Sequence, residues 1–169
     1  SEMEVITAIK QAATERRAVS ICGARHAMGG QQFGTNTLLI DLSRLTALHP
    51  VDTARGLVEA GAGIMWSELI DGLHSQQNGR ETVWSIRQKQ TGADDLTLGG
   101  SLAANIHGRG LKMRPIIDDV EAFTLIDGDG RRHRCSRDEN DELFRLAIGG
   151  YGCFGVITSV LLRLTPRQK

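Results

Sequence analysis

The segment AVSICGARHAMGGQQFG, residues 18–34, joins a short apolar strand, expected over residues 18–22, to a loop of glycines and other small residues. Glycine allows positive φ and lets the backbone approach another group closely. Because the loop has few large side chains, its backbone amides can come close to an anionic ligand. His26 lies inside this loop. It is either an ordinary hydrogen-bonded surface histidine or a neutral, nucleophilic imidazole held against a ligand.

Glycine is frequent along the whole chain, at 20 of 169 residues, and falls into three clusters over residues 23–34, 92–110 and 149–155. Clusters so far apart in sequence predict three loops that converge on one ligand. The alternative is three ordinary tight turns.

The second cluster, TLGGSLAANIHGRG over residues 97–110, predicts a tight turn at Gly99 and Gly100 that leads into a short helix, residues 101–105. The first amides of a helix lack partners within it and can bind an anion. Together with the loop after residue 22, this segment makes two amide-rich loops, which suit a pyrophosphate. The alternative is that the small residues serve helix packing alone.

The third cluster fits the G-x-G-x-x-G spacing of dinucleotide-binding loops at Gly150, Gly152 and Gly155. That motif binds a pyrophosphate only after a strand and before a helix. Here a helical segment precedes it and a β-branched strand follows, so the order argues against a Rossmann site. The sequence DGDG, residues 127–130, is interpreted as a hairpin turn, because an EF-hand loop needs a bidentate Glu where Asp138 stands.

Hydrophobic periodicity predicts one mixed α/β domain with antiparallel hairpins late in the chain. The expected helices cover residues 5–16, 64–77 and 139–148, and the expected strands cover residues 18–22, 38–42, 82–86 and 156–164. One expected hairpin pairs residues 45–52 with 57–62, and a second joins the two halves of 120–136. A long loop is expected over residues 87–98.

The composition indicates a globular chain with one core, since 40% of residues are hydrophobic. The formal net charge is zero, so the basic excess of a nucleic-acid binder is missing. No apolar run reaches the length of a membrane helix, and the first residues lack a signal-peptide core. The three cysteines are widely spaced, and together with the missing signal-peptide core this favours free thiols in the cytoplasm. His49, His74 and His133 fall in strand or helix patterns and are interpreted as structural.

Four blocks, in order, resemble the FAD-binding domain (PCMH-type) of the vanillyl-alcohol oxidase and p-cresol methylhydroxylase flavoenzymes. They are AVSICGARHAMGGQQFGTNTLLIDLSRL, VEAGAGIMWSELIDGL, LTLGGSLAANIHGRG and LAIGGYGCFGVITSVLLRLTP. The resemblance implies an α+β fold with two small subdomains, a short parallel βαβ sheet and a larger, mostly antiparallel sheet with flanking helices. It also implies FAD as the cofactor. The cofactor-binding residues that it implies are Gly23, Ala24, Arg25, His26, Ala27, Met28, Thr97, Gly99, Gly100, Ser101, Ala104, Ile106, His107 and Ile157.

Two branches of the family share features with this chain. GARHAMGGQQ is similar to the loop of cytokinin dehydrogenases and alditol or aldonolactone oxidases, in which a histidine at the place of His26 bonds covalently to the flavin. NIHGRG is more similar to the decaprenylphosphoryl-ribose oxidases, which bind FAD without such a bond. Arg25 stands where the covalent enzymes usually have glycine, which costs free energy if the position needs positive φ. Asp95 stands near the place of a second attachment cysteine, so a second bond is excluded.

The resemblance implies that residues 1–169 are the FAD-binding part of a longer oxidoreductase that oxidises an alcohol, such as a sugar or polyol, by hydride transfer to the flavin. Family members have a C-terminal substrate domain and a first N-terminal strand that this sequence lacks, so no catalytic side chain is assigned and the isolated chain is expected to be inactive. No metal site is expected. The alternatives are the NADPH-fed reductase branch of the same superfamily and a non-catalytic module that binds a nucleotide or a partner protein.

Overall fold

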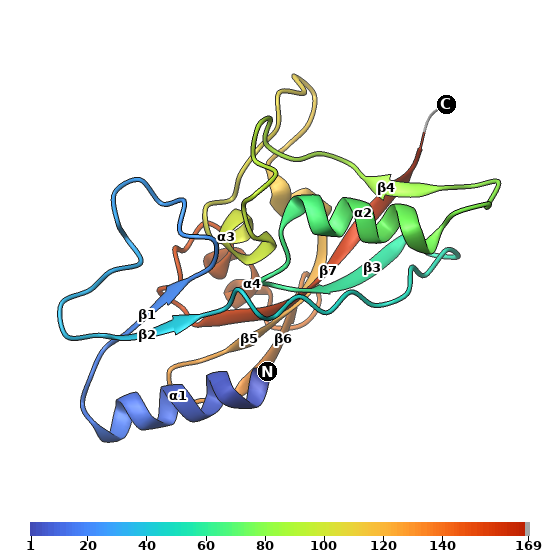
Figure 1. Cartoon of the computed structure of the whole chain (residues 1–169). Coiled ribbons are helices and arrows are strands. Elements are labelled where there is room, and N and C mark those ends of the chain that lie inside the picture. Colours follow the sequence, from blue (N-terminus) through green and yellow to red (C-terminus); the bar gives the residue numbers. More distant parts are fainter. Residues whose placement is uncertain (168–169) are drawn as a thin grey trace.

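The computed structural model describes residues 1–167, which form two sheets joined side by side and flanked by helices (Figure 1). The small sheet pairs β1 (Val19–Cys22) with β2 (Leu38–Asp41) in parallel. In the larger, antiparallel sheet β7 (Val156–Pro166) lies between β3 (Leu57–Gly61) and β5 (Val120–Ile126), β6 (Arg132–Ser136) pairs with β5, and β4 (Trp84–Ile86) pairs with the end of β7. The predicted α+β class with two small subdomains is therefore confirmed. Within the described residues the parallel strands are joined by a loop, and the helix of this unit precedes β1.

Helix α1 (Glu2–Thr14) covers the small sheet and the adjoining end of the large one. Its buried residues Val5, Ile9 and Ala12 recur at helical spacing. Val5 and Ile9 pack in one cluster with residues of β2, β5 and β7. Ser1 caps the helix, accepting a hydrogen bond from the Glu4 amide, which is why the helix starts three residues before the predicted boundary.

The larger sheet is built around β7 (Val156–Pro166), whose burial alternates along most of its length. It pairs with β3 (Leu57–Gly61) and β5 (Val120–Ile126) on its two edges, and its last residues pair with β4 (Trp84–Ile86). The prediction that residues 45–52 form a strand in a hairpin with β3 is wrong. Residues 45–52 contribute only the isolated bridges Leu48↔Ala60 and Asp52↔Leu57.

Three further helices pack around the sheet: α2 (Trp66–Gln76), α3 (Leu98–Ala103) and α4 (Asp141–Ala147). A 3-10 turn, η1 (Ile116–Asp119), leads into β5. Helix α2 lies along β3 and β7 in Figure 1 and buries Trp66, Leu69 and Leu73 at i, i+3 and i+7 in the main core. Within residues 1–167 no helix is long and apolar enough to cross a membrane.

The hairpin between β5 and β6 (Arg132–Ser136) closes through Asp127. Asp127 Oδ1 accepts hydrogen bonds from the amides of Asp129 (2.9 Å) and Arg131 (2.8 Å), and Asp127 Oδ2 lies 2.7 Å from His133 Nε2. Because the turn itself uses this carboxylate, DGDG is a hairpin turn, as predicted, and His133 has a structural role.

The two sheets meet where β3 and the residues after it cross the segment that follows β2. The Gly63 amide donates to the Leu45 carbonyl at 2.9 Å. A Cβ at Gly63 would lie 1.9 Å from the Leu42 carbonyl oxygen, and one at Gly61 would lie 2.1 Å from the Leu45 carbonyl oxygen. Two backbones can approach this closely only because neither position carries a side chain.

Candidate functional site

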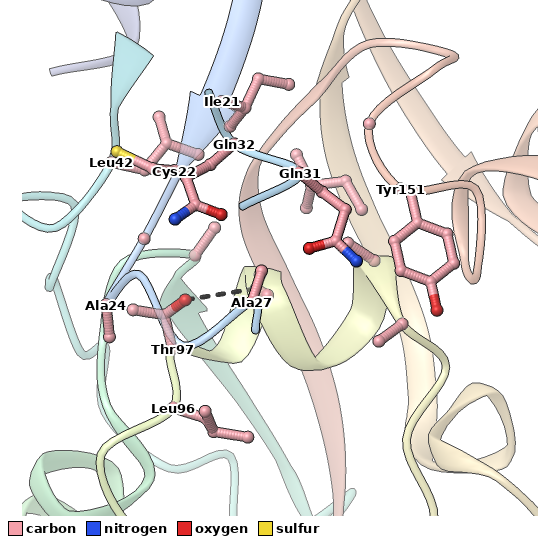
Figure 2. A pocket seen from close by; sticks show the side chains of 18 of the residues that line it. Ile21, Cys22, Ala24, Ala27, Gln31, Gln32, Leu42, Leu96, Thr97 and Tyr151 are labelled. Atoms are coloured by element: carbon pink, nitrogen blue, oxygen red, sulfur yellow. Dashed lines mark hydrogen bonds between the residues drawn. The ribbon is translucent and has the colours of Figure 1, made fainter. Parts of the chain in front are cut away.

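The three glycine-rich loops converge on one cavity of about 500 Å³. Its wall combines the end of β1 and the loop after it, the segment from Leu96 through α3 to Ile106, and the loop from Tyr151 to the start of β7 (Figure 2). Clefts of this volume are typical of cofactor and small-molecule sites. The glycine clusters therefore predicted the convergence correctly.

Eleven of the fourteen residues expected at the cofactor lie in this wall: Gly23, Ala24, Arg25, His26, Ala27, Thr97, Gly99, Gly100, Ala104, Ile106 and Ile157. The other three lie elsewhere. The Met28 side chain is fully exposed on the outer part of its loop. Ser101 is fully buried, and its hydroxyl accepts from Trp66 Nε1 at 2.8 Å. His107 lies beside Gln88 and Ile116, outside the cavity.

The first loop rests directly on the second at Gly23. A Cβ at Gly23 would lie 2.2 Å from Thr97 Oγ1 and 2.9 Å from Thr97 Cγ2. Thr97 is itself fixed, because it is buried and its Oγ1 caps α3 by accepting from the Gly100 amide at 3.3 Å. The closeness of the two loops therefore depends on glycine at residue 23.

The prediction that the first amides of the second loop are free for an anion is wrong. Helix α3 begins at Leu98, so both glycines lie within it, and the helix does not start at Ser101. The Leu98 amide donates to the Ile64 carbonyl at 2.8 Å and the Gly99 amide to the Ala62 carbonyl at 2.7 Å. A Cβ at Gly99 would lie 2.9 Å from Ala62 Cβ. The small residues thus serve helix packing, which was the alternative.

The first loop retains free backbone donors. In the described part of the chain, the amides of residues 23–29 have no hydrogen-bond acceptor, and the first internal bond of the loop is Gly30 N to Ala27 O at 3.0 Å. Backbone N–H groups are seldom left without partners in folded proteins. Seven consecutive free donors beside a cavity provide an anion-binding surface.

Arg25 is the charged side chain in this wall. It has φ 61°, in the left-handed region, so the position does require positive φ although it is not glycine. Its Nη2 lies 2.9 Å from Asp41 Oδ2. The Ser43 amide and side chain, together with Arg25, lower the pKa of Asp41 and keep it a carboxylate at neutral pH. Burial raises the pKa of the neighbouring Cys22 thiol, so it stays protonated there.

Replacing Arg25 with glycine is expected to raise Tm by roughly 2–4 °C, because glycine adopts this conformation without strain. Arg25→Ala is the matched control, since it also loses the ion pair but keeps a Cβ at positive φ. Thermal unfolding followed by circular dichroism compares the two variants. An Arg25→Gly chain no more stable than Arg25→Ala would contradict the assignment of strain.

Sequence reasoning missed several wall residues, among them Gln31, Gln32, Gln90 and Tyr151. The third loop reaches the cavity because the Gly149 amide donates to Leu102 O (2.9 Å) and the Tyr151 amide to Ala103 O (3.1 Å). The pair of amide side chains inside GGQQFG was a signal that could have been used. Among the described residues, no group of three or more His, Cys, Asp or Glu side chains is placed to hold a metal.

Comparison with known proteins places this architecture in a family. The chain is 32% identical to cytokinin dehydrogenase 10 of Oryza sativa subsp. japonica over 87% of this chain and 27% of that protein. It is 26% identical to L-gulonolactone oxidase of Bos taurus over 97% of this chain and 36% of that protein. The crystal structure of 6-hydroxy-D-nicotine oxidase from Arthrobacter nicotinovorans has the same fold, with TM-score 0.83 at 22% identity over 98% of this chain and 35% of that one.

The chain thus spans about a third of the length of the relatives that it matches. A family model described as "FAD binding domain" matches residues 1–136. This match covers β1, the first loop, α3 and the hairpin of β5 and β6, and so includes two of the three loops at the cavity. The chain therefore belongs to the FAD binding domain family of PCMH-type flavoproteins, and FAD is its cofactor.

Proposed function

We propose that this chain is the FAD-holding part of an oxidoreductase that oxidises an alcohol, with a sugar or polyol as the substrate class. The observation that carries the proposal is the row of free amides at residues 23–29, of which residues 23–27, including Arg25, lie on the wall of one cavity. The names of the relatives cover lactone oxidases, cytokinin dehydrogenases and a nicotine oxidase. The choice of a CH–OH donor follows the lactone oxidases among them.

The residues present fit an FAD. Its pyrophosphate is a dianion, and the first loop offers free N–H donors together with one guanidinium. The rest of the wall is largely apolar, from Ile21, Leu42, Leu96 and Ile157, and this suits the planar rings of the cofactor. Gln32 also brings a buried carboxamide oxygen without a partner to the same wall.

When bound, FAD supplies the hydride acceptor of the reaction. The chain's own residues bind and orient it. In this proposal the amides of residues 23–29 and Arg25 hold the pyrophosphate, and α3, fixed by Thr97 and by its bonds to Ile64 and Ala62, forms a rigid wall. The side chains that move the substrate's protons are proposed to come from the part of the full protein outside this chain.

We propose further that His26 is the covalent attachment point of the flavin. The left-handed conformation of Arg25 supports this, because the loop keeps the backbone shape of a glycine position just before the histidine. His26 is exposed at the cavity wall and is therefore free to meet a bound ring.

The test is an absorption scan from 300 to 550 nm on the full-length protein before and after acid precipitation. Flavin is expected to stay in the wild-type pellet and to pass into the supernatant of His26→Ala, with the flavin spectrum present in both proteins before acid. Release from the wild type as well would place the protein in the non-covalent branch. A wild type without flavin, even after incubation with FAD, would overturn the proposed function in favour of a binding module.

A further inference from the structure

Gln32 is a buried side chain in the cavity wall whose polar groups are unused. The residue is 8% exposed, and its Oε1 is shielded from solvent and accepts no hydrogen bond. Within residues 1–167 its Nε2 donates no hydrogen bond, but this nitrogen, unlike Oε1, is not shielded from solvent. An unpaired buried amide is costly, so such groups in folded proteins call for a specific explanation.

Gln77, the other deeply buried glutamine, shows what the fold does with such a group when the role is structural. Its Nε2 donates to the carbonyls of Leu73 (3.0 Å) and Trp84 (2.8 Å), and its Oε1 accepts from the Trp84 amide at 2.7 Å. Every group of that carboxamide is therefore paired within the chain. Gln32 differs because it lines the cavity, so a ligand bound there can supply the partner that the chain does not.

Figure 2 shows that the two neighbouring glutamines diverge, with the Gln31 side chain directed toward Tyr151 and that of Gln32 directed away from it. Gln31, Tyr151 and His26 are exposed and lie on the open part of the wall. A flavin ring that reacts with a substrate must lie on the accessible side of a site. The adenine takes no part in the reaction, so it can occupy a closed part such as that beside Gln32.

We propose that the Gln32 carboxamide binds the adenine of FAD and makes the site specific for an adenine nucleotide; this rests on the proposed function. A carboxamide presents one donor beside one acceptor, which matches the N6 amino group and the neighbouring ring nitrogen N7 on one edge of adenine. On that edge guanine presents two acceptors, O6 and N7, so it leaves the carboxamide oxygen without a donor. Because Oε1 is shielded from solvent, the terminal amide has to turn for it to meet the base, and its last torsion is soft.

The test compares wild type, Gln32→Leu and two control variants by titration with FAD, with ADP and GDP, and with FMN. Gln32→Leu is expected to weaken FAD and ADP about tenfold or more, to abolish the preference for ADP over GDP, and to leave FMN unchanged. Gln11→Leu, a change on the exposed side of α1, is the binding control. In the ligand-free chain Gln32→Leu is expected to keep or raise Tm, whereas Gln77→Leu lowers it, so the binding loss does not come from misfolding.

Each other outcome has a definite meaning. Wild type that binds FAD, with Gln32→Leu binding FAD and ADP equally well, would overturn the role of Gln32 and leave the proposed function intact. Loss of FMN binding with unchanged ADP binding would place Gln32 at the flavin ring and overturn the adenine assignment. Wild type that binds neither FAD nor ADP would overturn both the inference and the proposed function.

Discussion

Replacing Gly63 with alanine is expected to lower the free energy of unfolding by about 3 kcal/mol. The new Cβ would lie 1.9 Å from the Leu42 carbonyl oxygen and 2.9 Å from its carbon. No rotamer change relieves this contact, because both partners are backbone. The Gly63 amide is also bonded to the Leu45 carbonyl, so relief by moving the chain would break a hydrogen bond at the junction of the two sheets.

Gly128→Ala is the matched control for this prediction, since a Cβ at Gly128 meets no heavy atom within 4 Å. Thermal unfolding of both variants would show Tm lowered by roughly 6–12 °C for Gly63→Ala and nearly unchanged for Gly128→Ala. Equal Tm values in the two variants would mean that the sheets are not held together through this contact.

The second large effect is expected on cofactor affinity. Gly23→Ala should weaken FAD binding at least tenfold, because its Cβ would lie 2.2 Å from Thr97 Oγ1 and force the first loop away from α3. Displacing that loop moves the free amides of residues 23–27 off the cavity wall. Fluorescence titration of the ligand-free protein with FAD measures the change.

Thr97 allows a double-mutant cycle for this contact. Thr97→Ala removes both overlapping atoms, Oγ1 and Cγ2, at the cost of the helix cap, which contributes about 1 kcal/mol. The double variant Gly23→Ala/Thr97→Ala is expected to bind FAD more tightly than Gly23→Ala alone. Purely additive effects would show that the loops do not meet at this point.

Much of the fold follows from local pattern, and so does the place of the site. The apolar spacing in α1 and α2, the run of β7 and the Asp-Gly turn between β5 and β6 are signals within single segments, and the structure has all of them. The first loop was also accessible to sequence reasoning. The small residues after β1 predict a turn of the chain there. Arg25 is the exception, because it adopts the positive φ of a glycine position although it is not glycine.

Which backbone amides are free and which are hydrogen-bonded could not be predicted from the sequence. The two glycine loops look equally rich in donors, but the amides of Leu98 and Gly99 are taken by the carbonyls of Ile64 and Ala62. Those carbonyls come from the end of β3 and the turn before α2, more than thirty residues earlier. No pattern within residues 97–110 encodes that pairing, because it depends on how two distant segments pack.

Gln32 was missed for the same reason. In the sequence Gln32 looks like an ordinary polar loop residue. Only the packing of the cavity wall makes it a buried group without a partner. The glycines of the third loop indicated that it joins the other two at one cavity, whereas the order of its helix and strand only argued against a Rossmann site. Neither signal named Tyr151 as a residue of the cavity wall.

The pairing of β7 sets the order in which the protein can be completed during synthesis. Leu57 pairs with Arg163 and Gly61 with Ser159, so β3 waits for a partner that leaves the ribosome about a hundred residues later. Pairings of such long range are slow to form and leave strand edges exposed in the meantime. Ile157 and the loop before it also complete the cavity. The nascent chain is therefore expected to acquire its cofactor only after nearly all of these residues have emerged, and a chaperone would have its longest opportunity to bind β3 and β5 before then.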